Sequence, residues 1–406
     1  METLLTVENA RSRILETVAA QPIDRVGLQD SLYLTLAEAV RSDDDIPPFA
    51  NSAMDGYAVR SDDVAGGEAV LEVIDEIPAG SVSALTLRAG TCARIMTGAA
   101  VPAGADAIAQ VEWTEALPDG RVRILRAPAA GMHVRPAGQD AKRGQRMIEA
   151  GELITPPAIG MLATLGYGTV AVRRPPRVAV IATGDELLDP AEPLSPGKIR
   201  NSSGYALAAQ VVAAGGVPLA PLLARDHPDS IRAVIREALA ADVLVFSGGV
   251  SVGDYDLVKQ QLDEAGMELL FWKVKQRPGK PLAYGLLEGK PVFGLPGNPV
   301  SSAMCFEQYV RPALARMLGR NAVLRPRHPA ILAAATAKVP GLHFFTRGIA
   351  TYEADGRLTV RDTGPQASNL YSSVLGANCI IHLPEVWTEA PAGTPVDIEW
   401  LTWGAM

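Results

Sequence analysis

Val178-Ala179-Val180-Ile181-Ala182 leads into Thr183-Gly184-Asp185-Glu186-Leu187, and Val243-Leu244-Val245-Phe246 leads into Ser247-Gly248-Gly249-Val250-Ser251-Val252-Gly253-Asp254-Tyr255-Asp256. Each apolar run has the length and composition of a buried strand, and a segment of helical periodicity lies between the two runs. This order predicts a βαβ unit in a parallel sheet. Ligands of such sheets bind beyond the carboxyl ends of the strands, so we expect function to reside on these Gly-rich, acid-bearing loops.

The size and composition indicate a multidomain protein of a reducing compartment. The chain has 406 residues, 48% of them hydrophobic, and this length predicts roughly two to four domains. Cys92, Cys305 and Cys379 are far apart in sequence and form no CxxC pair, so neither a disulfide framework nor a structural zinc site is expected. The N-terminal segment is acidic where a signal peptide is basic, and no apolar run is long enough to cross a bilayer. We therefore expect a cytoplasmic protein.

The charge distribution favours a small anionic ligand over a polyanion. A net charge of -8 argues against nucleic-acid and membrane-surface binding, which reward a basic face. Local positive charge is nevertheless present in Lys273-Val274-Lys275-Gln276-Arg277-Pro278-Gly279-Lys280-Pro281. The five histidines show no metal-ligand spacing, so a catalytic metal is expected to have oxygen ligands.

Changes in periodicity and in Pro and Gly content divide the chain into four parts. Residues 1–44 and 138–172 are expected to form one discontinuous helical domain, interrupted by a β-rich insert at 45–137. Residues 173–325 are expected to form the α/β domain and 326–406 a small β-barrel or sandwich. The predicted helices are 7–18, 32–40, 158–165, 205–214, 230–240, 256–264 and 300–318, and the predicted strands outside the α/β domain include 69–77, 122–125, 358–360 and 379–383.

The two strand-end loops of the α/β domain carry the strongest chemical signal. In Ser247-Gly248-Gly249, glycines would expose backbone N–H groups to a phosphate, while Asp254 or Asp256 could reach a magnesium ion. Asp185 and Glu186 stand at the other strand end, although one of them could merely cap the following turn. Asp256 could likewise be only the N-cap of the next helix.

Two further loops of this domain could bind anions. Pro278-Gly279 turns the chain between Arg277 and Lys280 and would fix the two cations relative to each other, although a charged segment is most often a solvated turn. Phe293-Gly294-Leu295-Pro296-Gly297-Asn298-Pro299-Val300-Ser301-Ser302 leads from a strand into a helix, whose first N–H groups could cradle an anionic group. A tight strand-to-helix turn explains the same pattern.

Three motifs in the first half of the chain are weaker by themselves. Asp55-Gly56 within Asn51-Ser52-Ala53-Met54-Asp55-Gly56-Tyr57 is explained equally well by a plain turn before a strand. Thr97-Gly98 could present a hydroxyl and an N–H group to an oxyanion, or could simply end a strand. Arg135 and Asp140 flank a Gly turn, either facing an anion with its metal or as an exposed pair of little energetic value.

Together, the motifs SAMDGYAV, IMTGAAVP, RPAGQD, TGDEL, SGGVSVGDYD, PGKP and GLPGNPVSS resemble, in the same order, those of the molybdopterin molybdenumtransferase family, which includes the enzymatic domain of gephyrin. The resemblance spans about residues 5–320, and Ser368 to Pro384 is similar to the family's C-terminal β domain. It implies a molybdopterin-binding α/β domain with a parallel-rich sheet, a helical domain, a β-rich insert and a C-terminal β-barrel. It also implies an elongated homodimer, with each active site between the α/β domain of one subunit and the insert of the other.

The resemblance further implies a reaction and its participants. Adenylylated molybdopterin and molybdate are the substrates, the pyrophosphate bond is cleaved with magnesium present, molybdenum enters the dithiolene, and AMP leaves. Transient contacts with the adenylyltransferase and with apo molybdoenzymes are expected. A related adenylyltransferase or pyrophosphatase of the same fold, and a non-catalytic scaffold, are the alternative functions.

The resemblance assigns roles to individual positions. It implies a catalytic role for Asp55, Asp140, Glu186, Asp256 and Lys280, and magnesium ligation by Glu186, Asp226 and Asp256. Some family members carry lysine where this chain has Arg277, whose planar fork offers a different donor geometry. With the motif analysis, it gives as substrate-binding residues Thr97, Arg135, Thr183, Gly184, Ser247, Gly248, Gly249, Ser251, Arg277, Pro296, Asn298 and Pro299.

Overall fold

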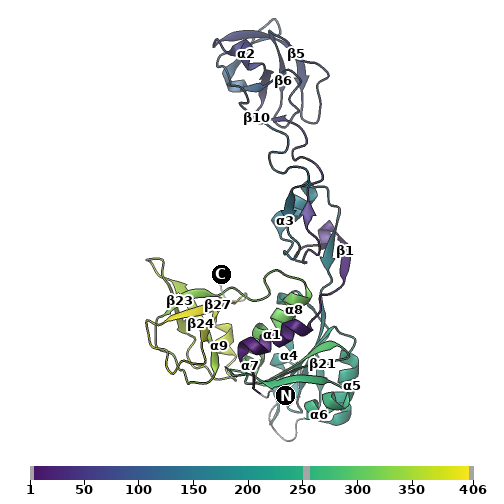
Figure 1. The fold of residues 1–406 in the computed structure, drawn as a ribbon, viewed down its shortest axis with the longest axis vertical. Coiled ribbons are helices and arrows are strands. Elements are labelled where there is room, and N and C mark those ends of the chain that lie inside the picture. Colours follow the sequence, from purple (N-terminus) through teal and green to yellow (C-terminus); the bar gives the residue numbers. More distant parts are fainter. Residues whose placement is uncertain (1–3, 250–256, 402–406) are drawn as a thin grey trace.

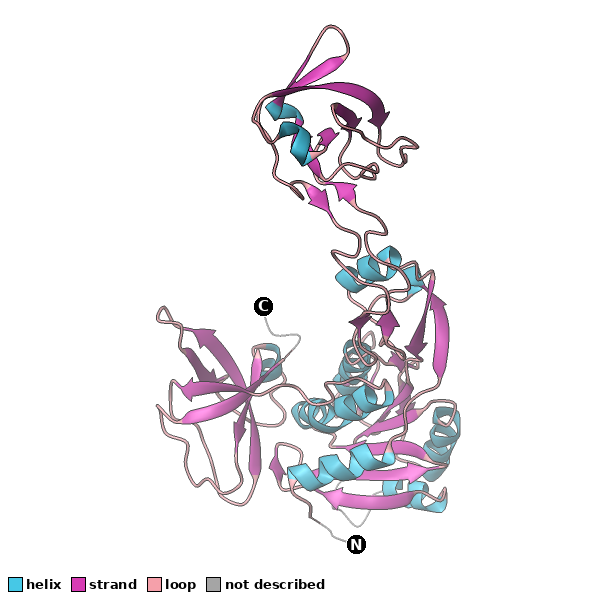
Figure 2. Ribbon diagram, turned by 45° about the horizontal axis from the view of Figure 1, so that its top comes forward, coloured by secondary structure: helices cyan, strands magenta, loops and turns pink. Residues whose placement is uncertain are grey.

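The computed structural model describes residues 4–249 and 257–401. The molecule is elongated: the α/β domain and the C-terminal domain lie side by side at one end, the insert lies at the other, and a narrow stalk joins them (Figure 1). Helices gather in the α/β domain and the stalk, whereas the insert and the C-terminal domain are mostly strand (Figure 2). Ser251 and Asp256, both predicted site residues, lie outside the described residues.

The α/β domain is built on one seven-stranded sheet with the order β16-β13-β18-β22-β21-β19 and β17 beside β13. Strands β16, β17, β13, β18 and β22 are parallel, and β21 and β19 continue the sheet antiparallel. The expected parallel-rich sheet is therefore confirmed. The strands are β13 (Arg177–Thr183), β16 (Val217–Pro218), β17 (Leu222–Ala224), β18 (Val243–Ser247), β19 (Glu268–Lys273), β21 (Pro281–Leu287) and β22 (Lys290–Leu295).

Helices cover both faces of this sheet, because successive side chains of a strand point to opposite faces. Val178 and Val180 pack into one apolar core and Ala179 and Ile181 into the other. The first core includes α1 (Val7–Thr17), α4 (Ser202–Ala213), α7 (Pro299–Cys305), the π-helical turn η3 (Phe306–Val310) and α8 (Arg311–Met317). The second includes α5 (Pro228–Ala238) and α6 (Leu257–Glu264).

The N-terminal helix packs on the α/β domain. Val7, Ala10 and Ile14 belong to the same buried core as the strands of that sheet, so α1 does not pack with the segment that follows it in sequence. Residues 1–44 are thus split between two packing units. The remaining domain boundaries stay a prediction.

The stalk is held by short strand pairs around a small core that contains Leu36, Leu162 and Val172. The predicted helix over residues 32–40 is wrong, because this stretch is a turn followed by isolated bridges and a bend. Leu36 donates its amide to Glu152 at 2.9 Å, and Ala37 donates to Ala171 at 2.9 Å. The elements are β1 (Ile23–Gly27) with β12 (Thr169–Arg173), β2 (Val40–Arg41) with β11 (Arg146–Ile148), η1 (Leu28–Asp30) and α3 (Pro156–Thr164).

The insert is a six-stranded sheet with the order β7-β4-β6-β5-β9-β8. At its base, β3 (Asn51–Ser52) pairs antiparallel with β10 (Val134–Arg135), so the chain enters and leaves the insert at one point. The other elements are β4 (Gly56–Val59), α2 (Ser61–Val64), β5 (Ala69–Ile77), β6 (Thr91–Ile95), β7 (Ala107–Gln110), η2 (Val111–Trp113), β8 (Thr114–Ala116) and β9 (Arg121–Ile124).

The C-terminal domain is a closed barrel. Its strands follow the order β24-β25-β23-β27-β26, and β26 pairs back onto β24, which confirms the expected β-barrel. β20 (Gln276–Arg277) of the α/β domain adds to this sheet, parallel to β24. The elements are β23 (His328–Leu332), β24 (His343–Tyr352), β25 (Leu358–Asp362), α9 (Ser372–Leu375), β26 (Cys379–Leu383) and β27 (Pro395–Trp400).

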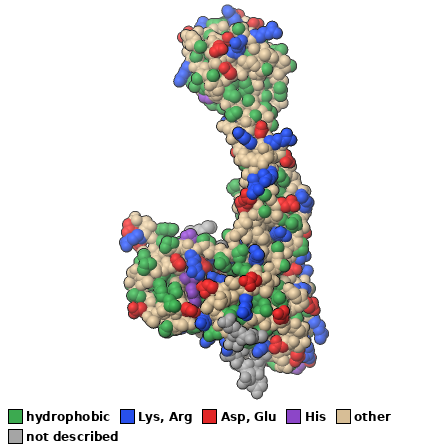
Figure 3. Space-filling view, viewed as in Figure 1, with side chains coloured by type: hydrophobic (Ala, Val, Ile, Leu, Met, Phe, Trp, Pro, Cys, Tyr) green, Lys and Arg blue, Asp and Glu red, His purple; other side chains and the backbone are tan. Residues whose placement is uncertain are grey.

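No helix within the described residues is both long enough and apolar enough to span a bilayer. On the face shown in Figure 3, Lys and Arg side chains are interspersed with Asp and Glu. The same view shows the stalk as a narrow waist between the insert and the rest of the molecule (Figure 3).

Candidate functional site

A cavity of about 1350 Å³ opens at the carboxyl ends of β13 and β18. Strand-end loops form its floor, the turn after β20 and the loop after β22 form one wall, and a C-terminal segment closes another. The predicted residues that line it are Thr183, Gly184, Glu186, Asp226, Ser247, Gly248, Gly249, Arg277, Lys280, Pro296, Asn298 and Pro299.

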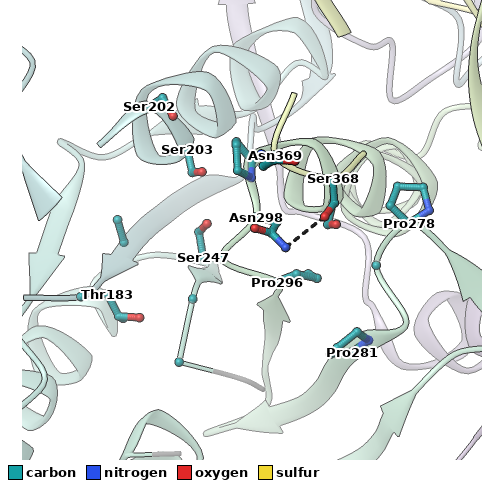
Figure 4. A pocket seen from close by; sticks show the side chains of 18 of the residues that line it. Thr183, Ser202, Ser203, Ser247, Pro278, Pro281, Pro296, Asn298, Ser368 and Asn369 are labelled. Atoms are coloured by element: carbon teal, nitrogen blue, oxygen red, sulfur yellow. Dashed lines mark hydrogen bonds between the residues drawn. The ribbon is translucent and has the colours of Figure 1, made fainter. Parts of the chain in front are cut away.

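Two buried hydroxyl groups lie on the floor of the cavity. Thr183 and Ser247 are 6% and 3% exposed and end neighbouring parallel strands, where Ala182 pairs with Ser247. Among the described residues, neither side-chain oxygen has a hydrogen-bond partner. Buried polar atoms are usually paired, so these hydroxyls are ready to bond a ligand that enters the cavity. In the view of Figure 4, Ser247 lies between Thr183 and Asn298.

The glycines of the floor are required by the backbone. Gly248 and Gly249 have φ of +98° and +62°, a region that disfavours residues with a Cβ atom. A side chain on either residue would also press against Thr183 Oγ1. The Ser-Gly-Gly motif therefore lets the chain turn closely over the end of β13 and leaves space above it.

Carboxylates line the edge of the cavity that lies beyond β13 and β17. The Asp185 amide donates to Asp226 Oδ2 at 3.3 Å, and the Asp226 amide donates to Asp185 Oδ1 at 3.2 Å, so the two loops brace each other. Glu186 is exposed, and its carboxylate lies over Gly184, where a Cβ atom would collide with it. Glu186 and Asp226 both line the cavity and offer the oxygen donors that hard cations prefer.

The described residues do not form a complete metal site by themselves. They contain no group of three or more His, Cys, Asp or Glu side chains placed to hold a metal ion. Magnesium, however, is usually held by only one or two carboxylates, with waters and substrate phosphates completing its shell. The pair Glu186 and Asp226 therefore fits magnesium bound jointly with a phosphorylated ligand.

Cations line the end of the cavity next to β21. Arg277 and Lys280 are both exposed and line the cavity on either side of the Pro278-Gly279 turn. The Arg277 guanidinium lies 5.2 Å from the centroid of the Phe344 ring in β24, a cation–π contact that fixes its direction. The turn is therefore supported by the C-terminal barrel.

The loop after β22 is joined to the C-terminal domain. Asn298 Nδ2 donates to Ser368 Oγ at 3.1 Å (Figure 4). The Val300 amide donates to the Ser368 carbonyl at 3.2 Å, so this N–H group is already paired within the chain. The expectation that N–H groups at the start of this helix cradle an anion therefore does not extend to Val300.

Sequence reasoning missed part of the cavity wall. Gln366 to Asn369, from the C-terminal domain, line the pocket, as do Arg200 and the residues that begin α4. Asn201 caps that helix, accepting from the Gly204 amide at 2.9 Å. Ser368 stood within a quoted C-terminal motif, but nothing local in the sequence indicated that it faces this cavity.

The four predicted site residues of the first half lie elsewhere. Thr97 donates its amide and its hydroxyl to Asp55 Oδ1 at 2.7 and 2.6 Å, and these bonds lower the pKa of Asp55. Arg135 belongs to β10 at the base of the insert, and the Asp140 amide donates to Ile46 at 2.9 Å in the stalk. None of the four lines the cavity, and the stalk separates the insert from the α/β domain (Figure 1).

Comparisons with family models cover nearly the whole chain. Residues 5–166 match the MoeA N-terminal region (domain I and II), residues 179–316 a probable molybdopterin binding domain, and residues 329–401 the MoeA C-terminal region (domain IV).

Full-length relatives agree with these matches. Molybdopterin molybdenumtransferase 2 of Mycobacterium tuberculosis is 39% identical over 95% of this chain and 96% of its own length. The molybdopterin molybdenumtransferase of Haemophilus influenzae is 34% identical over 98% of both chains. A solved structure of the molybdopterin biosynthesis moeA protein from Pyrococcus horikoshii has a TM-score of 0.83 at 27% identity, covering 98% of this chain and 100% of that one.

Proposed function

Because the chain belongs to the molybdopterin molybdenumtransferase family, a group of transferases of molybdenum cofactor biosynthesis, we propose that its cavity binds adenylylated molybdopterin. In the proposed reaction the pyrophosphate bond of this substrate is cleaved, molybdenum from molybdate enters the dithiolene, and AMP is released. The product is the molybdenum cofactor.

One observation carries the proposal: in the strand order of the sheet, carboxylates lie at one end of the cavity and cations at the other, with unpaired hydroxyl groups between them. Glu186 and Asp226 line one edge, and Arg277 and Lys280 line the other. A phosphoanhydride bears several negative charges, which cations can bind directly and carboxylates can bind only through a metal ion. A neutral or cationic substrate would not need both the cations and the metal-binding carboxylates.

The chain's own residues have separate roles in this scheme. Thr183 and Ser247 bond polar groups of the substrate at the floor, and Lys280 and Arg277 neutralise charge that grows on the leaving phosphate. Glu186 and Asp226 would hold magnesium, which would supply positive charge at the phosphoanhydride.

The insert is proposed to act in a second copy of the chain. Asp55, Thr97, Arg135 and Asp140 line no part of the cavity of their own chain, and the stalk holds them at a distance from it (Figure 1). In a homodimer, the insert of one subunit would complete the site of the other near the molybdate and the dithiolene. The adenylyltransferase and the apo molybdoenzymes are the proposed transient partners for substrate delivery and product release.

The deciding experiment measures AMP release from adenylylated molybdopterin by the purified protein with magnesium, in the presence and absence of molybdate. Release that depends on molybdate, with a product that activates an apo molybdoenzyme, is the expected result. Release that is indifferent to molybdate would indicate a pyrophosphatase, and no release would indicate a scaffold.

A further inference from the structure

The turn that carries the two cavity cations is held from its inner side by a buried polar cluster of Gln276, Cys305 and Tyr309. Gln276 is 1% exposed, and its Nε2 donates to the Gly279 carbonyl at 2.8 Å and to Cys305 Sγ at 3.3 Å. Cys305 Sγ also lies 3.7 Å from the Gly279 carbonyl. The cluster therefore hydrogen-bonds the backbone carbonyl of Gly279, the residue directly before Lys280.

Tyr309 sets the direction of the Gln276 amide. Its hydroxyl donates to Gln276 Oε1, which leaves the Nε2 end facing Gly279. Tyr309 is fully buried in the π-helical turn η3, and burial raises the pKa of this phenol well above its usual value. The hydroxyl therefore keeps its proton and remains a donor.

The fit around Gly279 is tight. This residue has φ of +83°, and a Cβ atom on it would collide with Cys305 Sγ. On its outer side, the turn is closed by the Val274 amide, which donates to the Lys280 carbonyl at 3.0 Å. The backbone of the turn is thus fixed on both sides, whereas the Lys280 side chain is exposed to the cavity.

We propose that Gln276 is a positioning residue that holds Lys280 in place for an anionic substrate by donating a hydrogen bond to the Gly279 carbonyl. Gln276 reaches the cavity lining, but its amide has no free donor for an anionic substrate, because Nε2 donates twice and Oε1 already accepts from Tyr309. An apolar replacement would leave the buried Gly279 carbonyl without this donor, a costly state that moving the turn toward water relieves. The role of Lys280 in this inference rests on the function proposed above.

The test compares Gln276→Leu and Tyr309→Phe with Gln261→Leu. Gln261 is a matched control, because it is also 1% exposed and its amide is also hydrogen-bonded, to Arg232 at 2.8 Å and to Glu264 at 3.0 Å. It packs outside the cavity lining. A loss of stability common to buried glutamines will therefore appear in both glutamine variants, whereas a positioning effect will not appear in Gln261→Leu.

The first readout is hydrogen–deuterium exchange of a peptide covering residues 274–281, which does not depend on activity. We expect faster exchange in Gln276→Leu and Tyr309→Phe than in the wild type and the control. Exchange unchanged in Gln276→Leu would overturn the proposal. If the wild type released no AMP, the proposed function would fail while this readout still decided whether Gln276 holds the turn.

The second readout is kcat/KM for AMP release. We expect roughly a tenfold fall in Gln276→Leu, equivalent to about 1.4 kcal/mol, and no fall in the control. In a Lys280→Ala background, Gln276→Leu should cause no further fall, because Gln276 acts through Lys280. A further tenfold fall in that background, or an equal fall in the control, would overturn the positioning role.

Discussion

Asn298 Nδ2 lies 3.1 Å from Ser368 Oγ and donates to it, which joins two residues that are 70 positions apart in sequence. The bond connects the loop after β22 with the segment of the C-terminal domain that lines the cavity. Together with the Val300–Ser368 backbone bond and the pairing of β20 with β24, it places the barrel against the cavity at two points. The shape of the cavity therefore depends on how the two domains dock.

Replacing Asn298 with alanine is expected to loosen this wall. The lost hydrogen bond is worth about 1 kcal/mol, and the protein should stay folded with a raised KM for AMP release. Asn321→Ala is the control, because the Asn321 amide bonds the Ala150 carbonyl at 2.9 Å in the stalk junction, outside the cavity lining. An unchanged KM in Asn298→Ala would contradict a role for this bond at the site.

Lys280→Ala is expected to lower kcat/KM roughly tenfold to a hundredfold, because a hydrogen bond to a charged group contributes about 1.5–3 kcal/mol. Steady-state AMP release measures the effect. Lys290→Ala, at the start of β22 and outside the cavity lining, should leave the rate unchanged. Equal activity of Lys280→Ala and the wild type would remove this cation from the site.

Glu186→Gln and Asp226→Asn keep the side-chain shapes but remove the charges that attract a hard cation. We expect each variant to need a roughly tenfold to hundredfold higher magnesium concentration for half-maximal AMP release, and chelation with EDTA to stop the wild type. Glu192→Gln is the control, because this acid bonds the Asp189 amide at 2.8 Å and lines no part of the cavity. A magnesium requirement that all three variants share with the wild type would exclude Glu186 and Asp226 as ligands.

Mixing two impaired variants tests whether the insert of one subunit serves the site of the other. If the insert serves the partner's site, Asp55→Ala and Lys280→Ala homodimers are each strongly impaired, but a mixed dimer contains one site with neither change. Random mixing after subunit exchange makes half of the dimers mixed, each with one intact site, so about a quarter of the wild-type activity should return. Activity that stays at the level of the separate variants, with exchange verified by mass spectrometry, would place Asp55 outside the shared site.

A buried histidine pair in the barrel should make stability depend on pH. His343 Nε2 lies 3.1 Å from His382 Nδ1, and burial, with the nearby charges of His382, Arg327, Arg11 and Lys338, lowers the pKa of His343 to about 3. The unfolded chain protonates this residue near 6.5, so it binds more protons than the folded chain below that pH. Stability contributed by the neutral His343 is therefore present above pH 6.5 and is lost progressively as the pH falls toward 3.

Thermal unfolding between pH 7.5 and 4.5 measures this effect. His343→Gln should flatten the fall in stability by up to about 1.4 kcal/mol per pH unit, whereas His227→Gln, at an exposed position in front of α5, should leave the buried pair and its slope in place. A His343→Gln slope equal to that of the wild type would show that this histidine does not control the acid sensitivity.

The sequence correctly predicted those helices and strands that are determined by their own residue pattern. The prediction was wrong where a segment pairs with residues far away in the sequence. Apolar runs such as 178–182 and 379–383 became buried strands because their own composition demands burial. Leu32, Leu36 and Val40 have helical spacing, yet Leu36 pairs with residues more than a hundred positions away, Glu152 and Val172. Such a pairing leaves no trace in the surrounding sequence.

The same distinction explains the site. Strand-end loops bring Thr183, Glu186 and Ser247 to one edge of the sheet as a direct consequence of parallel topology. Ser368 reaches the cavity only because the barrel docks beside it, and Gln276 is recognisable as a support only from its bonds to Gly279 and Tyr309. Neither relationship follows from residue type or spacing.

The pairing of β3 with β10 makes the insert removable. Because Ser52 and Val134 are neighbours in this ladder, the ends of the excised segment would be spanned by a short Gly-Ser link, and closing so small a gap costs little chain entropy. The shortened chain should fold around an unaltered cavity and still bind the nucleotide end of its substrate. The insert could then be exchanged between relatives as a unit. Such chimeras would separate the contribution of the insert to chemistry from the contribution of the cavity to binding.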